Sequence, residues 1–127
     1  MDDQSPTGEL TLQTLTMPKD TNANGDIFGG WLVSQMDLAA GIAMKKVAQG
    51  RSATVAIQNV SFLSPVAVGS TVSCYAEVKK IGNTSAHINI EVWMFDAVPG
   101  DSALKVAEGL FVFVAIDESG KSRPIPR

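Results

Sequence analysis

Cysteine and histidine are almost absent from this sequence: 127 residues contain one of each, Cys74 and His87. A lone cysteine excludes an internal disulfide and a thiolate metal cluster. Cys74 lies in a strand-like run, residues 71–76, which favours a buried structural thiol over a nucleophile. His87 alternates with apolar residues and has no cysteine, serine or acid placed beside it by the local pattern, which favours a solvent-facing strand position over a catalytic one. We therefore expect no metal site and no redox or nucleotide cofactor.

An excess of positive charge is also lacking, because 10 Lys and Arg stand against 13 Asp and Glu, a net charge of -3. This balance argues against a nucleic-acid-binding protein, although it allows a small polyanionic ligand where basic residues cluster locally. No apolar run is long enough to span a membrane, and the N-terminus is acidic and polar where a signal peptide would be basic and then apolar. We expect a cytoplasmic protein without membrane or nucleic-acid partners.

Repeats, low-complexity segments and linkers are missing as well, and 45% of the residues are hydrophobic. A chain of this length and composition can bury one core. Residues 1–127 are predicted to form a single domain.

The most informative pattern that is present joins a glycine pair, Gly29 and Gly30, to an acid in an apolar stretch, Asp37. The first N–H groups of a helix lack intrahelical partners and carry the positive end of its dipole, so they can hold a carbonyl oxygen that gains negative charge. Glycine lets a substrate come close to the backbone. Eight residues of helix rise about 12 Å, too far for one contact, so we predict that Asp37 meets the glycines of a second copy.

The helix is predicted over residues 28–48, with lysines in its last turn and Gly50 after it. At 100° per residue its polar or small positions form a narrow stripe and apolar side chains cover the rest, so we expect it to be buried nearly all round. Two simpler interpretations remain open from spacing alone. Asp37 can be an ordinary acid on a solvent-facing stripe, and Asp26 can be the helix cap.

Strand-like alternation precedes and follows the helix, first as an edge strand over residues 10–17 and then over residues 52–62, 71–81, 84–95 and 104–116. Turn residues separate the last four runs, at residues 64–65, 69–70, 82–83 and 99–101, so we expect these strands to pair antiparallel and in sequence. The polar face of residues 86–92, which carries His87, Asn89 and Glu91, is expected to be wet. The fold class predicted is α+β, a long central helix wrapped by five or six antiparallel strands, with an edge strand that favours dimerisation.

Several stretches of the chain closely resemble the YciA-type acyl-CoA thioesterases of the hotdog-fold superfamily. The first and most specific is residues 17–31, MPKDTNANGDIFGGW, followed by SQMD at 34–37. The resemblance continues through FLSPVAVG at 62–69, EVW at 91–93, FVAID at 113–117 and KSRP at 121–124. It covers nearly the whole chain.

The resemblance implies hydrolysis of an acyl-CoA thioester to CoA and a carboxylic acid. Asp37 would activate water or attack the thioester carbonyl directly, and the amide of Gly29 or Gly30 would polarise that carbonyl from the other subunit. Asn24 or Asp26 would orient water or the acyl group. Thr54, on the strand after the helix, would face the same cleft in the partner subunit. For CoA, the resemblance suggests contacts from Gly82, Asn83, Ser85 and Arg123.

The resemblance also favours a homodimer as the minimal unit and a homohexamer, a trimer of dimers, as the assembly. Large apolar residues are candidates for either the acyl pocket or the core: Trp31, Met36, Met44 and Phe62. Two other functions stay open. A non-catalytic acyl-CoA sensor would lose affinity through the desolvation of Asp37, and a dehydratase or hydratase would need a histidine base that His87 is poorly placed to supply.

Overall fold

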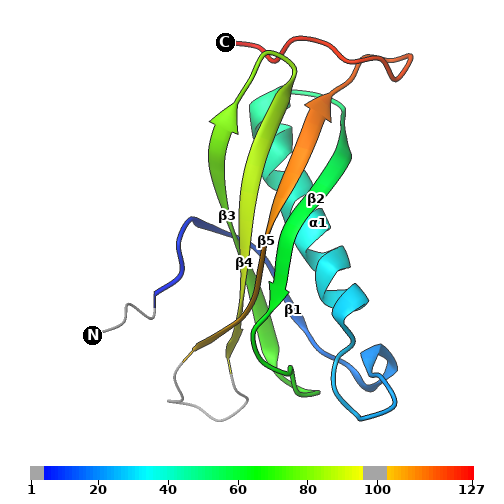
Figure 1. The fold of residues 1–127 in the computed structure, drawn as a ribbon, viewed down its shortest axis with the longest axis vertical. Helices are drawn as coiled ribbons and strands as arrows, with labels where there is room; N and C mark the ends of the chain where they lie inside the picture. Colours follow the sequence, from blue (N-terminus) through cyan, green and yellow to red (C-terminus); the bar gives the residue numbers. More distant parts are fainter. Residues whose placement is uncertain (1–4, 96–102) are drawn as a thin grey trace.

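A computed structural model describes residues 5–95 and 103–127 of the chain. One long helix, α1 (Gly29–Ala48), crosses one face of an antiparallel sheet (Figure 1). The five strands and one short 3-10 helix are β1 (Glu9–Leu15), η1 (Pro18–Asp20), β2 (Ser52–Phe62), β3 (Thr71–Ile81), β4 (Ser85–Phe95) and β5 (Leu104–Ala115). The α+β prediction is confirmed, with five strands in the described part of the chain. Among these residues no helix is long and apolar enough to cross a bilayer.

The strands lie in the order β1-β3-β4-β5-β2, with every neighbouring pair antiparallel. The expectation that the last four strands pair in sequence is correct for β3, β4 and β5 and wrong for β2, which pairs with β5 at the far edge. A tight turn at residues 82–84 makes β3 and β4 a hairpin, whereas residues 63–70 are long enough to carry the chain from one edge region of the sheet to the other. The turn predicted at residues 99–101 lies outside the described residues.

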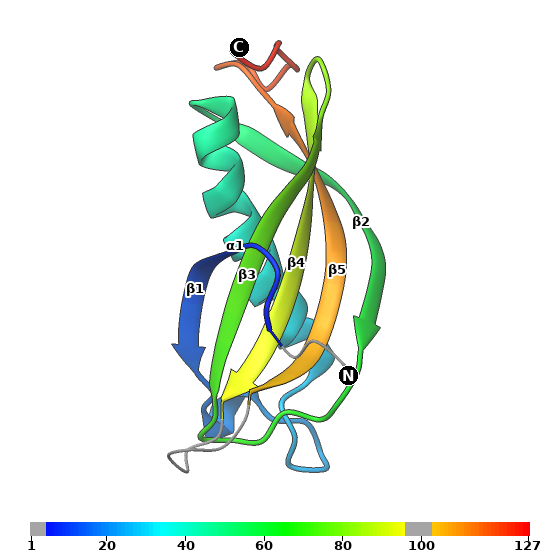
Figure 2. The ribbon, with the colours of Figure 1, turned by 90° about the vertical axis from the view of Figure 1, so that its left-hand side faces the viewer.

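The core lies between α1 and the sheet (Figure 2). Met36 and Met44 of the helix are fully buried there against alternate residues of β4 and against Phe111 of β5. The expectation that the helix is buried nearly all round is wrong for this chain, because Leu38 and Ile42 are 56% and 42% exposed. A single sheet covers only one side of a helix, so the outer side keeps its apolar residues at the surface.

The sheet face away from α1 is more buried than the alternation of polar and apolar residues in β4 predicts. Glu91, expected to be solvated, is 7% exposed. Its Oε1 accepts hydrogen bonds from the Trp93 indole N–H at 2.9 Å and from the Thr7 backbone N–H at 3.0 Å, and Lys105 lies 3.8 Å from Oε2. The segment before β1 and a neighbouring tryptophan therefore cover this carboxylate while satisfying its oxygens.

Candidate active site

Asp37 lies on α1 beside the edge strand β2. Its side chain is half-buried, and the Thr54 hydroxyl donates a hydrogen bond to Asp37 Oδ1 at 2.7 Å. The sequence predicted Thr54 in the cleft of a partner subunit, but the structure places it against the Asp37 of its own chain. The hydrogen bond fixes one carboxylate oxygen, and the other has no hydrogen-bond partner among the described residues. Asp37 is thus a held carboxylate, which disfavours the interpretation of an ordinary acid on a solvated stripe.

The helix begins at Gly29 without a side-chain cap. Phe28 is the N-cap residue, in an extended conformation, and the first turn contains no acidic residue. Asp26 does not cap the helix, so that interpretation is wrong. A β-carbon on Gly29 would lie 3.0 Å from Cζ of Phe62, which means that the phenyl ring already occupies the space beside the backbone. The positive end of the helix dipole is therefore not neutralised by a side chain.

A cleft of about 550 Å³ opens beside this helix end. Its lining combines the loop before α1, the first turn of α1 and the segment after β2: Asn22, Asp26, Ile27, Gly29, Leu32, Phe62, Leu63, Ser64, Pro65 and Val66. Mostly apolar walls with a few polar groups suit an acyl chain with a carbonyl at one end. Of the four candidates for the acyl pocket, Phe62 lines the cleft, Met36 and Met44 belong to the core, and Trp31 is partly buried against that core.

Sequence reasoning missed Asn22 as a residue of this cleft. Its side-chain oxygen accepts hydrogen bonds from the backbone N–H groups of Asn24 at 2.8 Å and Asp26 at 3.2 Å, which shapes the loop. Asn24, predicted as a secondary site residue, is exposed and contributes this backbone N–H, whereas Asp26 does line the cleft. The position of Asn22 in a turn-rich loop was a signal that could have identified it. Asparagine side chains commonly accept a hydrogen bond from the backbone N–H group two residues later in the sequence.

Asp37 is not among the residues that line the cleft. Along one helix Gly29 and Asp37 are separated by a rise of about 12 Å. One chain therefore carries two separate parts, a held carboxylate beside β2 and an uncapped helix end beside the cleft. A thioester carbonyl can meet both kinds of group at once only if they come from different copies of the chain.

The four predicted CoA contacts lie together at the other end of α1. The C-terminal tail packs on the hairpin between β3 and β4, where Ile125 donates its N–H to Asn83 O at 2.8 Å and Arg127 Nη2 donates to Gly82 O at 2.7 Å. Arg123 donates from Nη2 to the carbonyls of Ala48 and Arg51, and from Nε to Ile116 O. Its guanidinium thus satisfies carbonyls at the helix C-terminus, and its predicted role toward CoA stays a prediction.

We expect Arg123→Ala to lower stability, because it removes the side-chain donor to Ala48 O at the negative end of α1 and to Ile116 O. The loss should be roughly 2 kcal/mol, or about 7 °C in Tm for a chain of this length, measured by thermal unfolding. Lys121→Ala removes an exposed charge nearby and is the control. An unchanged Tm together with a raised KM for acyl-CoA would instead support the CoA contact.

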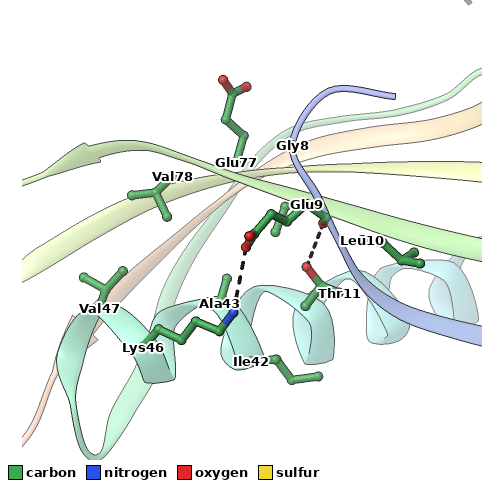
Figure 3. Close-up of a pocket in the computed structure, with 11 residues that line it drawn as sticks. Gly8, Glu9, Leu10, Thr11, Ile42, Ala43, Lys46, Val47, Glu77 and Val78 are labelled. Atoms are coloured by element: carbon green, nitrogen blue, oxygen red, sulfur yellow. Dashed lines mark hydrogen bonds and ion pairs between the residues drawn. The ribbon is translucent and has the colours of Figure 1, made fainter. Parts of the chain in front are cut away.

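A second cleft, of about 420 Å³, lies between β1, β3 and the C-terminal half of α1 (Figure 3). Its floor is apolar, with Ile42, Ala43 and Val78, and Glu9 and Lys46 form an ion pair of 3.8 Å across it. None of the residues predicted for catalysis or CoA binding lines it. This cleft is therefore separate from the site described above.

Within residues 5–95 and 103–127 no group of three or more histidine, cysteine, aspartate or glutamate residues could hold a metal ion. Cys74 is fully buried, and burial raises the pKa of its thiol to about 12. The prediction of a structural thiol rather than a nucleophile agrees with both facts.

Comparison with known proteins gives the family. A model described as the thioesterase superfamily matches residues 24–98. The acyl-CoA thioester hydrolase YciA of Salmonella typhimurium is 54% identical over 126 residues, covering 98% of this chain and 95% of that protein. The chain belongs to the YciA-like acyl-CoA thioesterases of the hotdog-fold superfamily.

Solved structures of two hexameric thioesterases share the fold over nearly the whole chain. The hexameric thioesterase y2039 from Yersinia pestis has a TM-score of 0.91 at 51% identity, covering 97% of this chain and 99% of that one. HI0827, described as a hexameric broad specificity acyl-coenzyme A thioesterase, has a TM-score of 0.89 at 46% identity, covering 97% and 84%. The predicted family, hotdog fold and thioester hydrolase class are confirmed.

Proposed function

We propose that this YciA-like protein hydrolyses acyl-CoA thioesters in a site shared between two copies of the chain. The observation that carries the proposal is the separation of Asp37, held by Thr54, from the uncapped helix end at Gly29 and Gly30. YciA of Salmonella typhimurium and HI0827 are described as an acyl-CoA thioester hydrolase and an acyl-coenzyme A thioesterase, which supports acyl-CoA as the substrate. A cytoplasmic location remains a prediction.

The amides of Gly29 and Gly30 receive the thioester oxygen as it becomes an oxyanion, an interaction typically worth about 3 kcal/mol. As a general base, Asp37 of the other copy takes a proton from water, whose oxygen forms the new C–O bond. The C–S bond then breaks, CoA leaves as its thiolate, and the proton returns to the sulfur. As a nucleophile, Asp37 would instead attack the carbonyl carbon and expel the CoA thiolate, which leaves a mixed anhydride. Water would hydrolyse the anhydride to the free acid and Asp37, and the released proton would go to the thiolate.

The shared site calls for a dimer in which β2 is the contact strand. β2 is an edge strand that pairs only with β5 among the strands of residues 5–95 and 103–127, and Val55 and Ile57 on it are 58% and 45% exposed. Thr54 lies on the same strand, so pairing of two β2 edges brings a second helix toward Asp37. We propose this dimer as the minimal unit and a trimer of dimers as the assembly, because the two solved relatives are described as hexameric.

Thr54 acts in this scheme as a positioning residue. We expect Thr54→Val to lower kcat by about tenfold or more, because a charge-assisted hydrogen bond to Asp37 is lost, while KM changes little. Thr54→Ser keeps the hydroxyl and should retain most of the activity in steady-state assays. Equal kcat values for Val and Ser variants would remove the assigned role.

The test of the proposed function is release of CoA from short, medium, long and aromatic acyl-CoAs, followed with a thiol reagent. Since Cys74 is buried with a raised pKa, the folded protein should add little background to the signal. Turnover of at least one thioester supports the hydrolase. Tight acyl-CoA binding without turnover of any thioester would favour the sensor.

A further inference from the structure

A third cleft, of about 350 Å³, lies on the sheet face away from α1, and we call it the outer-face cleft. His87 and Asn89 line it from β4, and they alternate with Ala86, Ile88 and Ile90, which belong to the core on the helix side. Lys79 and Lys80 border it from β3, Leu110 from β5 and Asn59 from β2. No residue of the candidate active site takes part in this lining.

Two irregularities in the sheet build the outer-face cleft. The register of β3 against β4 shifts between Val78 and Lys80, so two consecutive lysines reach one cleft although neighbouring strand residues normally point to opposite faces. The register of β2 against β5 shifts between Gln58 and Ser61, and Asn59 there has a left-handed φ of 55°. Asparagine tolerates that conformation better than most residues.

The polar groups of the outer-face cleft are largely unused. In the described part of the chain Lys80, His87, Asn59 and Asn89 make no side-chain hydrogen bond or ion pair, and Lys79 has one exposed contact, 3.5 Å to Glu77.

The one carboxylate in the lining, Glu108, accepts a hydrogen bond from Lys105 at 2.9 Å. That bond raises the pKa of Lys105, which keeps its balancing charge in place. The lining therefore contains two ammonium groups, an imidazole and two carboxamides, beside one acid that is paired with Lys105.

We propose that the outer-face cleft binds the phosphate-bearing part of a nucleotide. Lys79 and Lys80 supply the charge-assisted hydrogen bonds that a phosphate requires, and His87 adds a further donor. Asn59 and Asn89 each present a donor and an acceptor, which suits a base or ribose, and Leu110 gives an apolar surface. The volume is larger than inorganic phosphate needs and is of the size typical for small-ligand sites.

Two sources can supply this ligand. CoA carries a phosphorylated adenosine diphosphate, so the nucleotide can be the far end of the substrate, and in that case the proposal rests on the proposed function. A free nucleotide that binds as an effector has the same chemistry. The protein carries a negative net charge, so a polyanion should bind only where positive charges are concentrated locally. The outer-face cleft is a place of this kind.

The test is ADP binding by titration calorimetry, with inorganic phosphate as a second probe. We expect ADP to bind the wild type, and Lys79→Gln combined with Lys80→Gln to weaken binding about tenfold or more. Replacement of both lysines by arginine should keep it, and Lys46→Gln, which removes an exposed lysine elsewhere, should not change it. No ADP binding by the wild type, or equal affinity in the double Gln variant, overturns the proposal.

Kinetics then separate the two sources. If the substrate supplies the nucleotide, the double Gln variant raises KM for acyl-CoA but not for the matching acyl-pantetheine, and ADP competes with acyl-CoA. If a free nucleotide binds, KM stays unchanged and ADP binds in the presence of CoA. ADP binding needs no turnover, so an absence of thioester hydrolysis would reject the proposed function without deciding this one.

Discussion

Asp37→Asn should lower kcat for acyl-CoA hydrolysis by roughly 10²- to 10⁴-fold, the range typical for a positioned base. Asparagine has the same shape and can accept the Thr54 hydroxyl at its side-chain oxygen, so the local packing around Oδ1 should survive. It cannot take a proton from water or attack a carbonyl. KM should change little, because the loss falls on the transition state rather than on substrate binding.

Steady-state kinetics on the best acyl-CoA substrate test the predicted loss of kcat. Thermal unfolding of the same variant tests whether the fold is kept. Glu118→Gln, in an exposed loop away from the cleft, is the matched control and should behave as the wild type. Retention of more than about a tenth of the wild-type kcat in Asp37→Asn would show that the carboxylate is not at the chemistry.

Mixing two inactive variants should restore activity if the site is shared between chains. Gly29→Val places a side chain where a β-carbon already meets Phe62 at 3.0 Å, so it should disturb the helix end and the cleft. Its Asp37 stays intact, while Asp37→Asn keeps an intact helix end. If subunits exchange at random, about half of the dimers contain one copy of each variant. Each mixed dimer has one intact site out of two, so about a quarter of the wild-type activity should return.

The measurement is kcat after the two variants are unfolded together and refolded, or coexpressed with different tags and purified as the mixed species. Each variant refolded alone is the control and should remain inactive. Mixed species that form but show no recovery would contradict the shared site and the dimer proposed here.

The sequence by itself determined the elements and the family. Apolar residues recur at every second position of a half-buried strand and at every third or fourth position of a half-buried helix. These two patterns located α1 and four of the strands to within about one residue. The motif at residues 17–37 identified the family and singled out Gly29, Gly30 and Asp37. Local patterns carry this information because helix ends, turns and buried faces are properties of neighbouring residues.

Only the tertiary structure decided which distant elements meet. No local pattern shows that β2 pairs with β5, yet that pairing sets Thr54 against Asp37 and puts β2 at the edge of the sheet. In the same way, packing of the C-terminal tail places Arg123 against the C-terminus of α1. Two register shifts bring residues of four strands together in the outer-face cleft. Contacts between residues far apart in sequence depend on how whole elements pack, because packing and edge pairing are decided by the shape of the assembled core.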